Sequence, residues 1–190
     1  MNVMLEWIGA TTGIASVYLT ARRSLWCWPI GLVSVIVYGY FFLRIHLFAD
    51  SALQGFYLLT GILGWIHWAR GGPDHSVAPI RVLKPRQRLT IAMVLLFWVP
   101  CVSLLLARFT SASYPFLDTL TASLSVAAQL LLMRKYLDSW LLWIAVDLLS
   151  LFLYGIKEAW VTLALYAVYL ILASMGWSNW RQAIRKGESV

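Results

Sequence analysis

Seven long apolar runs follow one another along the chain, and each is about as long as a bilayer is thick. A helix needs roughly 20 mostly apolar residues to cross a hydrocarbon core of about 30 Å, with its backbone groups paired inside the segment. The runs are continuous and lack the polar alternation of barrel strands, so helices are predicted. They lie at about residues 3–20, 24–43, 47–69, 89–107, 114–133, 139–156 and 159–178. The sequence therefore predicts an all-α membrane protein with seven transmembrane helices.

Charged residues are scarce in this chain. Of its 190 residues, 61% are hydrophobic and 12% are charged, whereas a soluble domain carries about 25% charged residues. Too few polar side chains remain to cover a water-soluble globule. Residues 1–7 contain no basic side chain, so we interpret them as the start of a retained span and not as a cleaved signal. The polar segment 70–88 contains two glycines and three prolines and is predicted to be a connecting loop.

The basic residues are distributed unequally between the two predicted sides of the membrane. Twelve of the 15 lysines and arginines fall on one side, whereas Arg44, Arg108 and Lys157 fall on the other. Because basic loops stay in the cytoplasm, the N-terminus is predicted outside and the C-terminus inside. The net charge of +7 is thus interpreted as a topology signal in the lipid bilayer, and binding of nucleic acid is not expected.

The chain also contains an internal repeat, which appears when it is shifted by 112 residues without a gap. Tryptophans alone could mark similar depths at the interface, but they do not explain matched glycines and basic pairs. The aligned pairs are Arg22 and Arg134, Arg23 and Lys135, Trp28 and Trp140, Phe48 and Trp160, Tyr57 and Tyr169, Gly64 and Gly176, Trp65 and Trp177, and Trp68 and Trp180. We predict two parallel three-helix repeats around one extra helix, a 3+1+3 arrangement found in transporters.

Three parts follow from this arrangement. The first three-helix repeat is predicted at residues 1–69. Residues 70–113 would form a cytoplasmic loop and the connecting helix. The second three-helix repeat and a cytoplasmic tail would occupy residues 114–190.

Sequence motifs of catalysis are absent from the chain. It contains no GxxxxGK[ST] loop, no HExxH and no GxSxG. Cys27 and Cys101 belong to no CxxC or Cys/His cluster, so neither a metal site nor a disulfide is predicted. We expect no catalytic residue and no cofactor.

Asp147 is the strongest candidate for a functional residue, because it lies in the middle of the span at 139–156. An ionised carboxylate there costs roughly 2.5–3.5 kcal/mol on insertion scales. Helical spacing places Trp143, Asp147, Ser150 and Tyr154 on one stripe. Aromatic rings beside a carboxylate suit a flat cationic ligand. The alternatives are a structural hydrogen bond between helices and a protonated aspartate.

A second polar stripe lies on the third span. It consists of Gln54, Tyr57, Gly61, Trp65 and Trp68. The Gln54 side chain both donates and accepts hydrogen bonds, as sugar hydroxyls or a carboxamide require. Its alternative role is to hold neighbouring helices together.

Ser34, in the second span, is a weaker candidate for the same site. Small polar residues in membrane helices often only permit close packing of their neighbours.

Several segments together resemble the PnuC family of vitamin transporters. They are the sequences WPIGL at 28–32, LQ at 53–54, GWIHW at 64–68, MRKY at 133–136 and WLLW at 140–143. The resemblance covers about residues 7–182. It implies a 3+1+3 fold like that of the sugar-transporting SWEET proteins, usually assembled as a homotrimer in the bacterial inner membrane.

The resemblance also implies an activity. Members of the family take up nicotinamide riboside by facilitated diffusion, and a cytoplasmic kinase phosphorylates the product so that uptake becomes one-way. By the motif match, Gln54, Trp65, Trp68 and Trp143 would line or gate the path. Relatives commonly have asparagine in the second and sixth spans, where this chain has Ser34 and Asp147. Thiamine or another vitamin therefore remains an alternative substrate.

From these observations we hypothesise alternating access around a site at the middle of the membrane. Aromatic rings would hold the cation, and Asp147 would offset its charge. Gln54 would form hydrogen bonds with the hydroxyl or amide groups of the substrate. A sugar or small-metabolite facilitator of the same fold is a second possibility. A membrane anchor or assembly subunit without transport is a third, although it would not need a buried acid.

Overall fold

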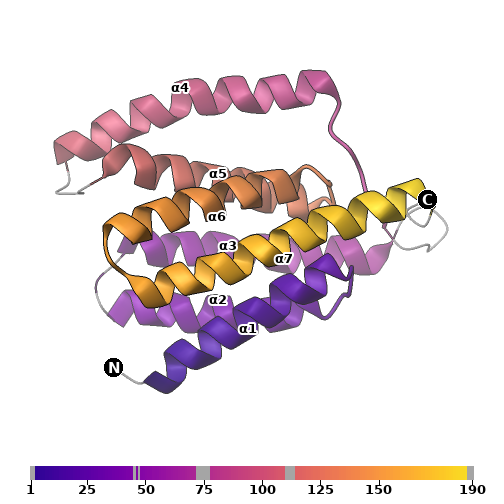
Figure 1. Ribbon diagram of the computed structural model, residues 1–190, viewed down its shortest axis with the longest axis horizontal. Helices are drawn as coiled ribbons and strands as arrows, with labels where there is room; N and C mark the ends of the chain where they lie inside the picture. The colour runs from indigo at the N-terminus through magenta and orange to yellow at the C-terminus, as the bar shows by residue number, and fades with distance from the viewer. Residues whose placement is uncertain (1–2, 45, 47, 72–77, 110–113, 188–190) are drawn as a thin grey trace.

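The computed structural model describes residues 3–44, 46, 48–71, 78–109 and 114–187 (Figure 1). Within these residues the chain forms seven α-helices, as the apolar runs predict. They are α1 (Val3–Ala21), α2 (Cys27–Arg44), α3 (Phe48–Arg70), α4 (Pro85–Phe109), α5 (Pro115–Met133), α6 (Ser139–Ile156) and α7 (Trp160–Arg185). In the described part of the chain, α2, α4, α5, α6 and α7 are long and apolar enough to cross a membrane.

Two predicted boundaries are wrong by several residues. α4 begins at Pro85, which lies within the predicted loop 70–88. Proline is tolerated in the first turn of a helix because its missing N–H would have no partner there. α7 ends at Arg185 instead of residue 178, since the last turns contain polar residues that continue the helix beyond its apolar part.

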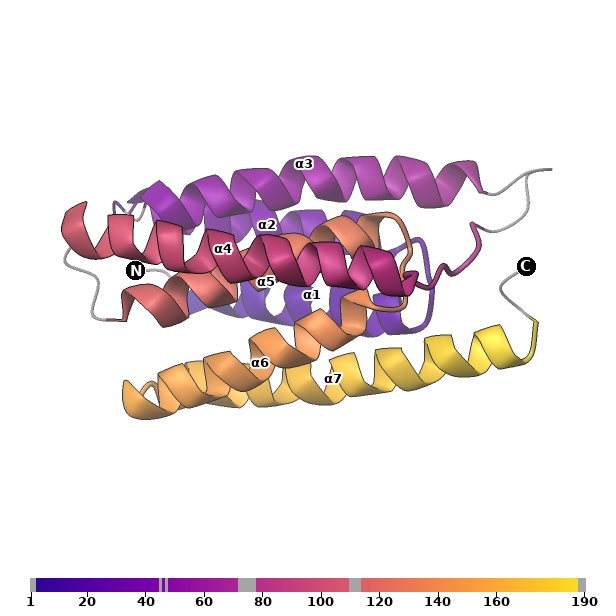
Figure 2. The ribbon, with the colours of Figure 1, turned by 90° about the horizontal axis from the view of Figure 1, so that it is seen from above.

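Six of the helices form a closed ring. In chain order α1, α2, α3, α5, α6 and α7 each pack against the next, and α7 packs back against α1. α4 packs against α5 from outside the ring and lies at the edge of the bundle (Figures 1 and 2). All seven helices run roughly along the long axis of the molecule. The ring, and not α4, therefore defines the interior of the protein.

The two ends of the ring differ in charge. One end carries the α1–α2 turn with Arg22 and Arg23, and the α5–α6 turn with Arg134 and Lys135. The C-terminal end of α7 lies at the same end, on the right of Figure 1. We call this the basic end. The start of α1 and the α6–α7 turn lie at the opposite end.

Four tryptophans pack together at the basic end. The rings of Trp28 and Trp68 meet edge to face with centroids 5.3 Å apart, and those of Trp140 and Trp180 do so at 5.5 Å. Trp68 and Trp180 join the two pairs at 5.7 Å. All four side chains are buried, and the Lys135 ammonium lies 4.9 Å from the Trp68 ring. This tryptophan cluster fills the ring at the basic end.

Two glycines make room for the cluster. The Trp28 ring lies directly against Gly64 of α3, and the Trp140 ring lies against Gly176 of α7. A Cβ atom at either glycine would overlap the indole. The glycines are therefore required for the close approach of these rings to the neighbouring helix.

The turns on either side of α2 and of α6 share an unusual backbone geometry. Arg23 and Lys135 both have φ near +61°, and each N–H bonds to the carbonyl three residues before it. His46 and Glu158 have φ of +62° and +54°. A non-glycine residue seldom adopts this left-handed conformation. It recurs here at an interval of 112 residues, at both ends of α2 and of α6.

Residues 78–84, which we call the strap, bind the α5–α6 turn. Arg81 donates its N–H to the Lys135 carbonyl at 2.9 Å and accepts from the Leu137 N–H at 2.8 Å. The Lys135 ammonium donates to the Ala78 carbonyl. Burial, together with the charge of Arg23, lowers the pKa of Lys135 to about 8.

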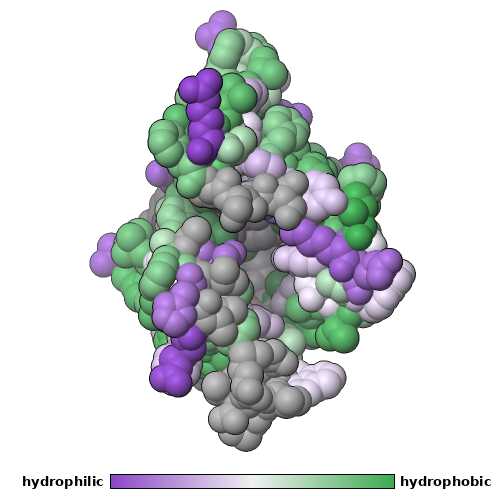
Figure 3. Space-filling view, turned by 90° about the vertical axis from the view of Figure 1, so that its left-hand side faces the viewer, coloured by the Kyte–Doolittle hydropathy of each residue, from purple (hydrophilic) through white to green (hydrophobic). Residues whose placement is uncertain are grey.

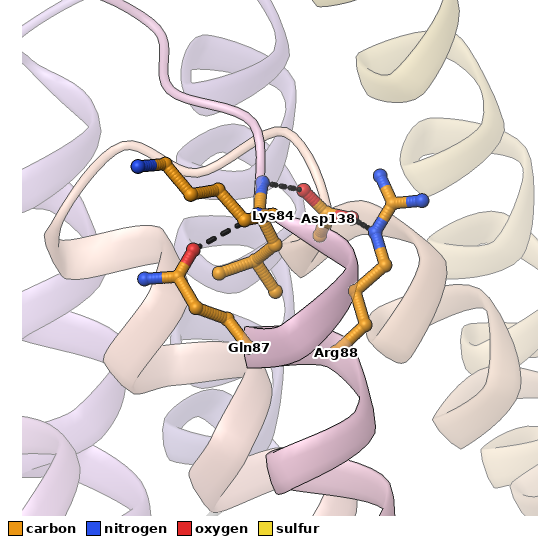
Figure 4. Close-up of polar contacts among 5 residues, drawn as sticks. Lys84, Gln87, Arg88 and Asp138 are labelled. Atoms are coloured by element: carbon orange, nitrogen blue, oxygen red, sulfur yellow. Dashed lines mark hydrogen bonds and ion pairs between the residues drawn. The ribbon is translucent and has the colours of Figure 1, made fainter.

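Asp138 completes the attachment of the strap (Figure 4). Its buried carboxylate accepts from the Leu83 N–H and from Arg88 Nε, each at 2.8 Å. Beside it, the Lys84 N–H donates to the Gln87 side chain at 2.9 Å, which caps the start of α4. The strap and α4 are thus bound to the α5–α6 turn and α5.

Alanine at Gly64 or Gly176 should lower the thermal stability of the protein, because the new Cβ would overlap a buried indole. Overpacking of this kind costs about 1–3 kcal/mol. Gly55 provides the control, since a Cβ there would meet nothing within 4 Å. Gly55→Ala should leave the melting temperature unchanged or raise it. Thermal unfolding in detergent measures all three, and equal shifts for Gly64→Ala and Gly55→Ala would contradict the packing described.

Candidate functional site

Asp147 lies in the middle of α6 and is only 4% exposed. Its carboxylate makes no hydrogen bond or ion pair with the residues that the structure describes. A buried carboxylate is normally stabilised by a partner, since its desolvation costs several kcal/mol. Asp147 therefore has no compensating group among the described residues.

Two tyrosines of α7 lie beside this carboxylate. Tyr166 and Tyr169 are both close enough to Asp147 to interact with it electrostatically. The Tyr166 hydroxyl also contacts the side chain of Ser150, which is 1% exposed. Tyr154 of α6 stacks on Tyr166 with ring centroids 5.4 Å apart and an interplanar angle of 16°. We call these five residues the Asp147 site.

The first two helices close the site from the other side. Tyr169 places its hydroxyl at Gly13 of α1, where a Cβ atom would lie 2.5 Å from the oxygen. The same Cβ would lie 3.2 Å from the Ser34 hydroxyl of α2. Ser34 is buried and donates to the Gly9 carbonyl at 2.8 Å. Ser34 thus joins α2 to α1 directly beside the Tyr169 hydroxyl.

The polar residues predicted on α3 face two neighbouring helices. Tyr57 contacts the side chain of Ser125 on α5, and Ser125 is itself buried. Gln54 is half-buried, and its Cβ lies against Gly39 of α2. Gln54 and Tyr57 therefore lie on faces of α3 that contact the rest of the ring and do not project into lipid.

The predicted tryptophans occupy other places. Trp65 of α3 is 40% exposed, and Trp68 is buried in the tryptophan cluster. Trp143 is half-buried and packs against that cluster from α6. In the described structure, Asp147 and Tyr154 are brought together through Tyr166, but Trp65 and Trp68 are not brought to them.

The sequence motifs do not single out Tyr166 and Tyr169 as candidate site residues. Two signals could have identified them. The 112-residue alignment pairs Tyr169 with Tyr57, which was itself a candidate. The two tyrosines are three residues apart on one helix and so lie on one face of it.

The interior of the ring is approached from the end opposite the basic end. Seen from that end, the surface is hollowed at its centre between the helices (Figure 3). Lys157 in the α6–α7 turn lies 4.0 Å from Asp118 at the start of α5 and 5.9 Å from the Tyr154 ring. Tyr154 thus connects the Asp147 site with this end of the molecule. The tryptophan cluster fills the ring at the other end.

The chain matches a known family over almost its whole length. The family described as nicotinamide mononucleotide transporter matches residues 3–182. The chain belongs to this family. Membership confirms the resemblance found in the sequence and makes the chain a transporter and not an enzyme. Together with its apolar helices, it makes the chain a multi-pass protein of the bacterial inner membrane.

Individual members of the nicotinamide mononucleotide transporter family are similar to the chain over most of their length. The nicotinamide riboside transporter PnuC of Escherichia coli is 23% identical, with 96% of this chain and 87% of the relative covered. The riboflavin/roseoflavin transporter RibM of Streptomyces davaonensis is 25% identical, with 92% and 83% covered. The crystal structure of the vitamin B3 transporter PnuC superposes with a TM-score of 0.78 at 24% identity, covering 97% of this chain and 83% of that one. The chain therefore has the fold of that transporter.

The contact between Gly13 and Tyr169 predicts a specific pattern of mutant stabilities. Gly13→Ala should destabilise the protein by about 1–3 kcal/mol, because its Cβ would overlap the tyrosine hydroxyl. Tyr169→Phe removes that oxygen, so Gly13→Ala should cost clearly less in the phenylalanine background.

The four melting temperatures of this double-mutant cycle in detergent give the coupling. Gly155→Ala is the control, since a Cβ there would meet Leu163 at an ordinary 3.6 Å. Additive effects of the two changes would show that the contact is not made.

Proposed function

We propose that the chain carries nicotinamide riboside across the bacterial inner membrane by facilitated diffusion. The observation that carries this proposal is the buried Asp147 carboxylate, which has no partner among the described residues. Nicotinamide riboside bears a permanent positive charge on a flat ring and hydroxyl groups on its ribose. A carboxylate beside tyrosine rings matches the ring by charge pairing and by cation–π attraction.

The remaining polar residues suit the rest of this substrate. Gln54, Tyr57 and Ser34 can donate or accept hydrogen bonds to the ribose hydroxyls or the carboxamide. Trp65, Trp68 and Trp143 belong to the proposal as residues along or at the end of the path. The family description and the name of the Escherichia coli relative support the same substrate class.

A second candidate is a carrier for a different vitamin. The relative from Streptomyces davaonensis is named as a riboflavin and roseoflavin transporter, and riboflavin carries no positive ring. A thiamine carrier would use Asp147 for the thiazolium cation, whereas a carrier for a neutral vitamin or a sugar would not need the carboxylate. Whether the site binds a charged ligand more tightly than an uncharged one therefore distinguishes these candidate functions.

Asp147→Asn should weaken binding of nicotinamide riboside by at least about tenfold, because the amide keeps the shape but not the charge. Binding of the uncharged dihydro form of the same riboside should change far less. The comparison requires titration of the purified protein with both compounds. Glu158→Gln, at an exposed turn, is the control and should affect neither. Equal losses for both compounds would assign Asp147 a structural role.

The proposed architecture consists of two parallel repeats in a SWEET-like 3+1+3 order. Residues 1–69 and 114–190 would be the repeats, and residues 70–113 the connecting part. The left-handed turns that recur at 112 residues support this, as do the matched tryptophan–glycine contacts. The ring order α1–α2–α3–α5–α6–α7 is also what two such repeats facing each other would give.

The orientation and assembly of the protein are part of the same proposal. The basic end would face the cytoplasm, so the N-terminus would lie outside and the C-terminus inside. A homotrimer is proposed from the family resemblance, and α4 carries exposed large apolar side chains that could face lipid or another copy. A cytoplasmic kinase would phosphorylate the transported riboside and make uptake one-way without a coupling ion.

Transport would proceed by rocking of the two repeats around the Asp147 site. At the basic end, α7 is bound to the α1–α2 region by Trp180 Nε1, which donates to the Thr20 carbonyl at 3.1 Å. Asn179 donates to the Ala21 carbonyl at 3.5 Å. Lys135, in the α5–α6 turn, also lies over the ring of Trp68 on α3. Opening toward the cytoplasm would separate these contacts, while the strap would move with α5 and α6.

Cross-linking Ala21→Cys to Asn179→Cys should stop transport, because it would hold the basic end closed. The matched pair Arg81→Cys and Tyr136→Cys joins the strap to the turn that it already binds, so its cross-link should leave transport intact. Both pairs are placed in a chain with Cys27→Ala and Cys101→Ala. Uptake of labelled riboside into vesicles is measured before oxidation, after it, and after reduction. Continued uptake with the 21–179 link formed would contradict the rocking mechanism.

A further inference from the structure

The helices α1–α3 and the helices α5–α7 carry different residues at the positions around Asp147 and at their aligned counterparts. In the 112-residue alignment, three residues of the Asp147 site correspond to an aliphatic, a phenyl and an amide side chain in α2 and α3, whereas Tyr169 corresponds to Tyr57. The pairs are Asp147 and Val35, Tyr154 and Phe42, and Tyr166 and Gln54. The Asp147 carboxylate and the stacked pair of Tyr154 and Tyr166 therefore have no equivalent at the aligned positions of α2 and α3.

The tyrosine rings on this side hold one another in fixed orientations. Tyr154 stacks on Tyr166, and Lys157 lies over the Tyr154 ring at 5.9 Å. Tyr166 and Tyr169 meet at 76° with centroids 6.0 Å apart. In such an edge-to-face pair, the ring that presents its edge keeps both faces free of the other ring. Tyr166 and Tyr169 thus form a preoriented aromatic corner beside the carboxylate.

The tryptophans are poorer candidates for holding a cation. The Lys135 ammonium lies 4.9 Å from the Trp68 ring centroid, so that ring already interacts with a positive charge. Arg23 lies near enough to Lys135 to repel it. A substrate cation at Trp68 would meet the same repulsion, whereas at Tyr166 it would meet the Asp147 carboxylate.

We infer that Tyr166 and Tyr169 hold the positively charged ring of the substrate against α7, next to Asp147. Tyr154 is a positioning residue, because it stacks behind Tyr166 and fixes its orientation. The uncharged, hydroxyl-bearing part of the substrate then lies toward α3, whose aligned positions carry Gln54 and Tyr57. This inference rests on the proposed transport of a cationic riboside and names the residues that select for its charge.

The test compares nicotinamide riboside with its dihydro form, which has the same ribose but an uncharged ring. Tyr166→Leu and Tyr169→Leu should each weaken binding of the charged form by about 3- to 30-fold, and that of the dihydro form by less than threefold. Tyr166→Phe keeps the ring face and should retain the preference for charge. Tyr154→Leu should reduce the preference to an intermediate extent. Titration of the purified full chain gives each dissociation constant.

Tyr40→Leu is the matched control, since Tyr40 is 53% exposed on α2, and it should leave both constants unchanged. The phenylalanine variants keep the test decisive should a leucine variant fail to fold. Equal weakening of both forms by the leucine variants, or loss of the charge preference in Tyr166→Phe, would overturn the inference. If Asp147→Asn removes the preference and the tyrosine variants do not, the proposed function stands and this inference is wrong. If the unmodified protein does not bind nicotinamide riboside, the proposed function itself fails.

Discussion

Lipid offers no hydrogen bonds, and this constraint determines where every polar side chain of the spans can lie. Most hydroxyls satisfy it within their own helix. Thr20, Thr60, Thr119 and Ser125 each donate to the carbonyl four residues earlier, at 2.7–2.8 Å. A carboxylate cannot do so, because it only accepts and its helix carbonyls only accept. Some buried donors, such as Trp28 Nε1 and Trp140 Nε1, also have no hydrogen-bond partner in the described structure, but Asp147 is an acid in the middle of a span that no described residue compensates.

The helices could be predicted from the sequence because bilayer thickness fixes their length and apolar character reveals it. The predicted start of α4 and end of α7 were wrong, because span length and apolar character do not show where a helix continues into polar residues. Proline is typical of loops, so Pro85 was not expected in a helix. In the first turn of α4, however, its missing N–H removes no hydrogen bond from the helix. The last turns of α7 lie beyond the apolar part, so hydropathy gave no reason to extend the helix to Arg185.

The candidate site could be predicted only in part. Asp147 was recognisable, because an ionisable residue in an apolar run is rare. Tyr166 and Tyr169 were not, since tyrosines in spans are also common at membrane interfaces. Helical spacing was a second source of error. It shows which residues share a face of a helix, but those residues can lie at different depths in the membrane. Gln54 and Trp68 share a face of α3 but are separated by about 21 Å along its axis.

The position of Asp147 also bears on the direction of transport. On the proposed mechanism, a bound cation neutralises this carboxylate while the ring rearranges, so the loaded carrier moves without a buried net charge. The empty carrier must return with the carboxylate either exposed alone to the closed interior, at a cost of roughly 2.5–3.5 kcal/mol, or protonated. The same residue that favours a cationic substrate therefore slows the return of the empty carrier. On the same proposal, consumption of the substrate inside the cell would leave no cation there to be carried back by the faster, loaded route.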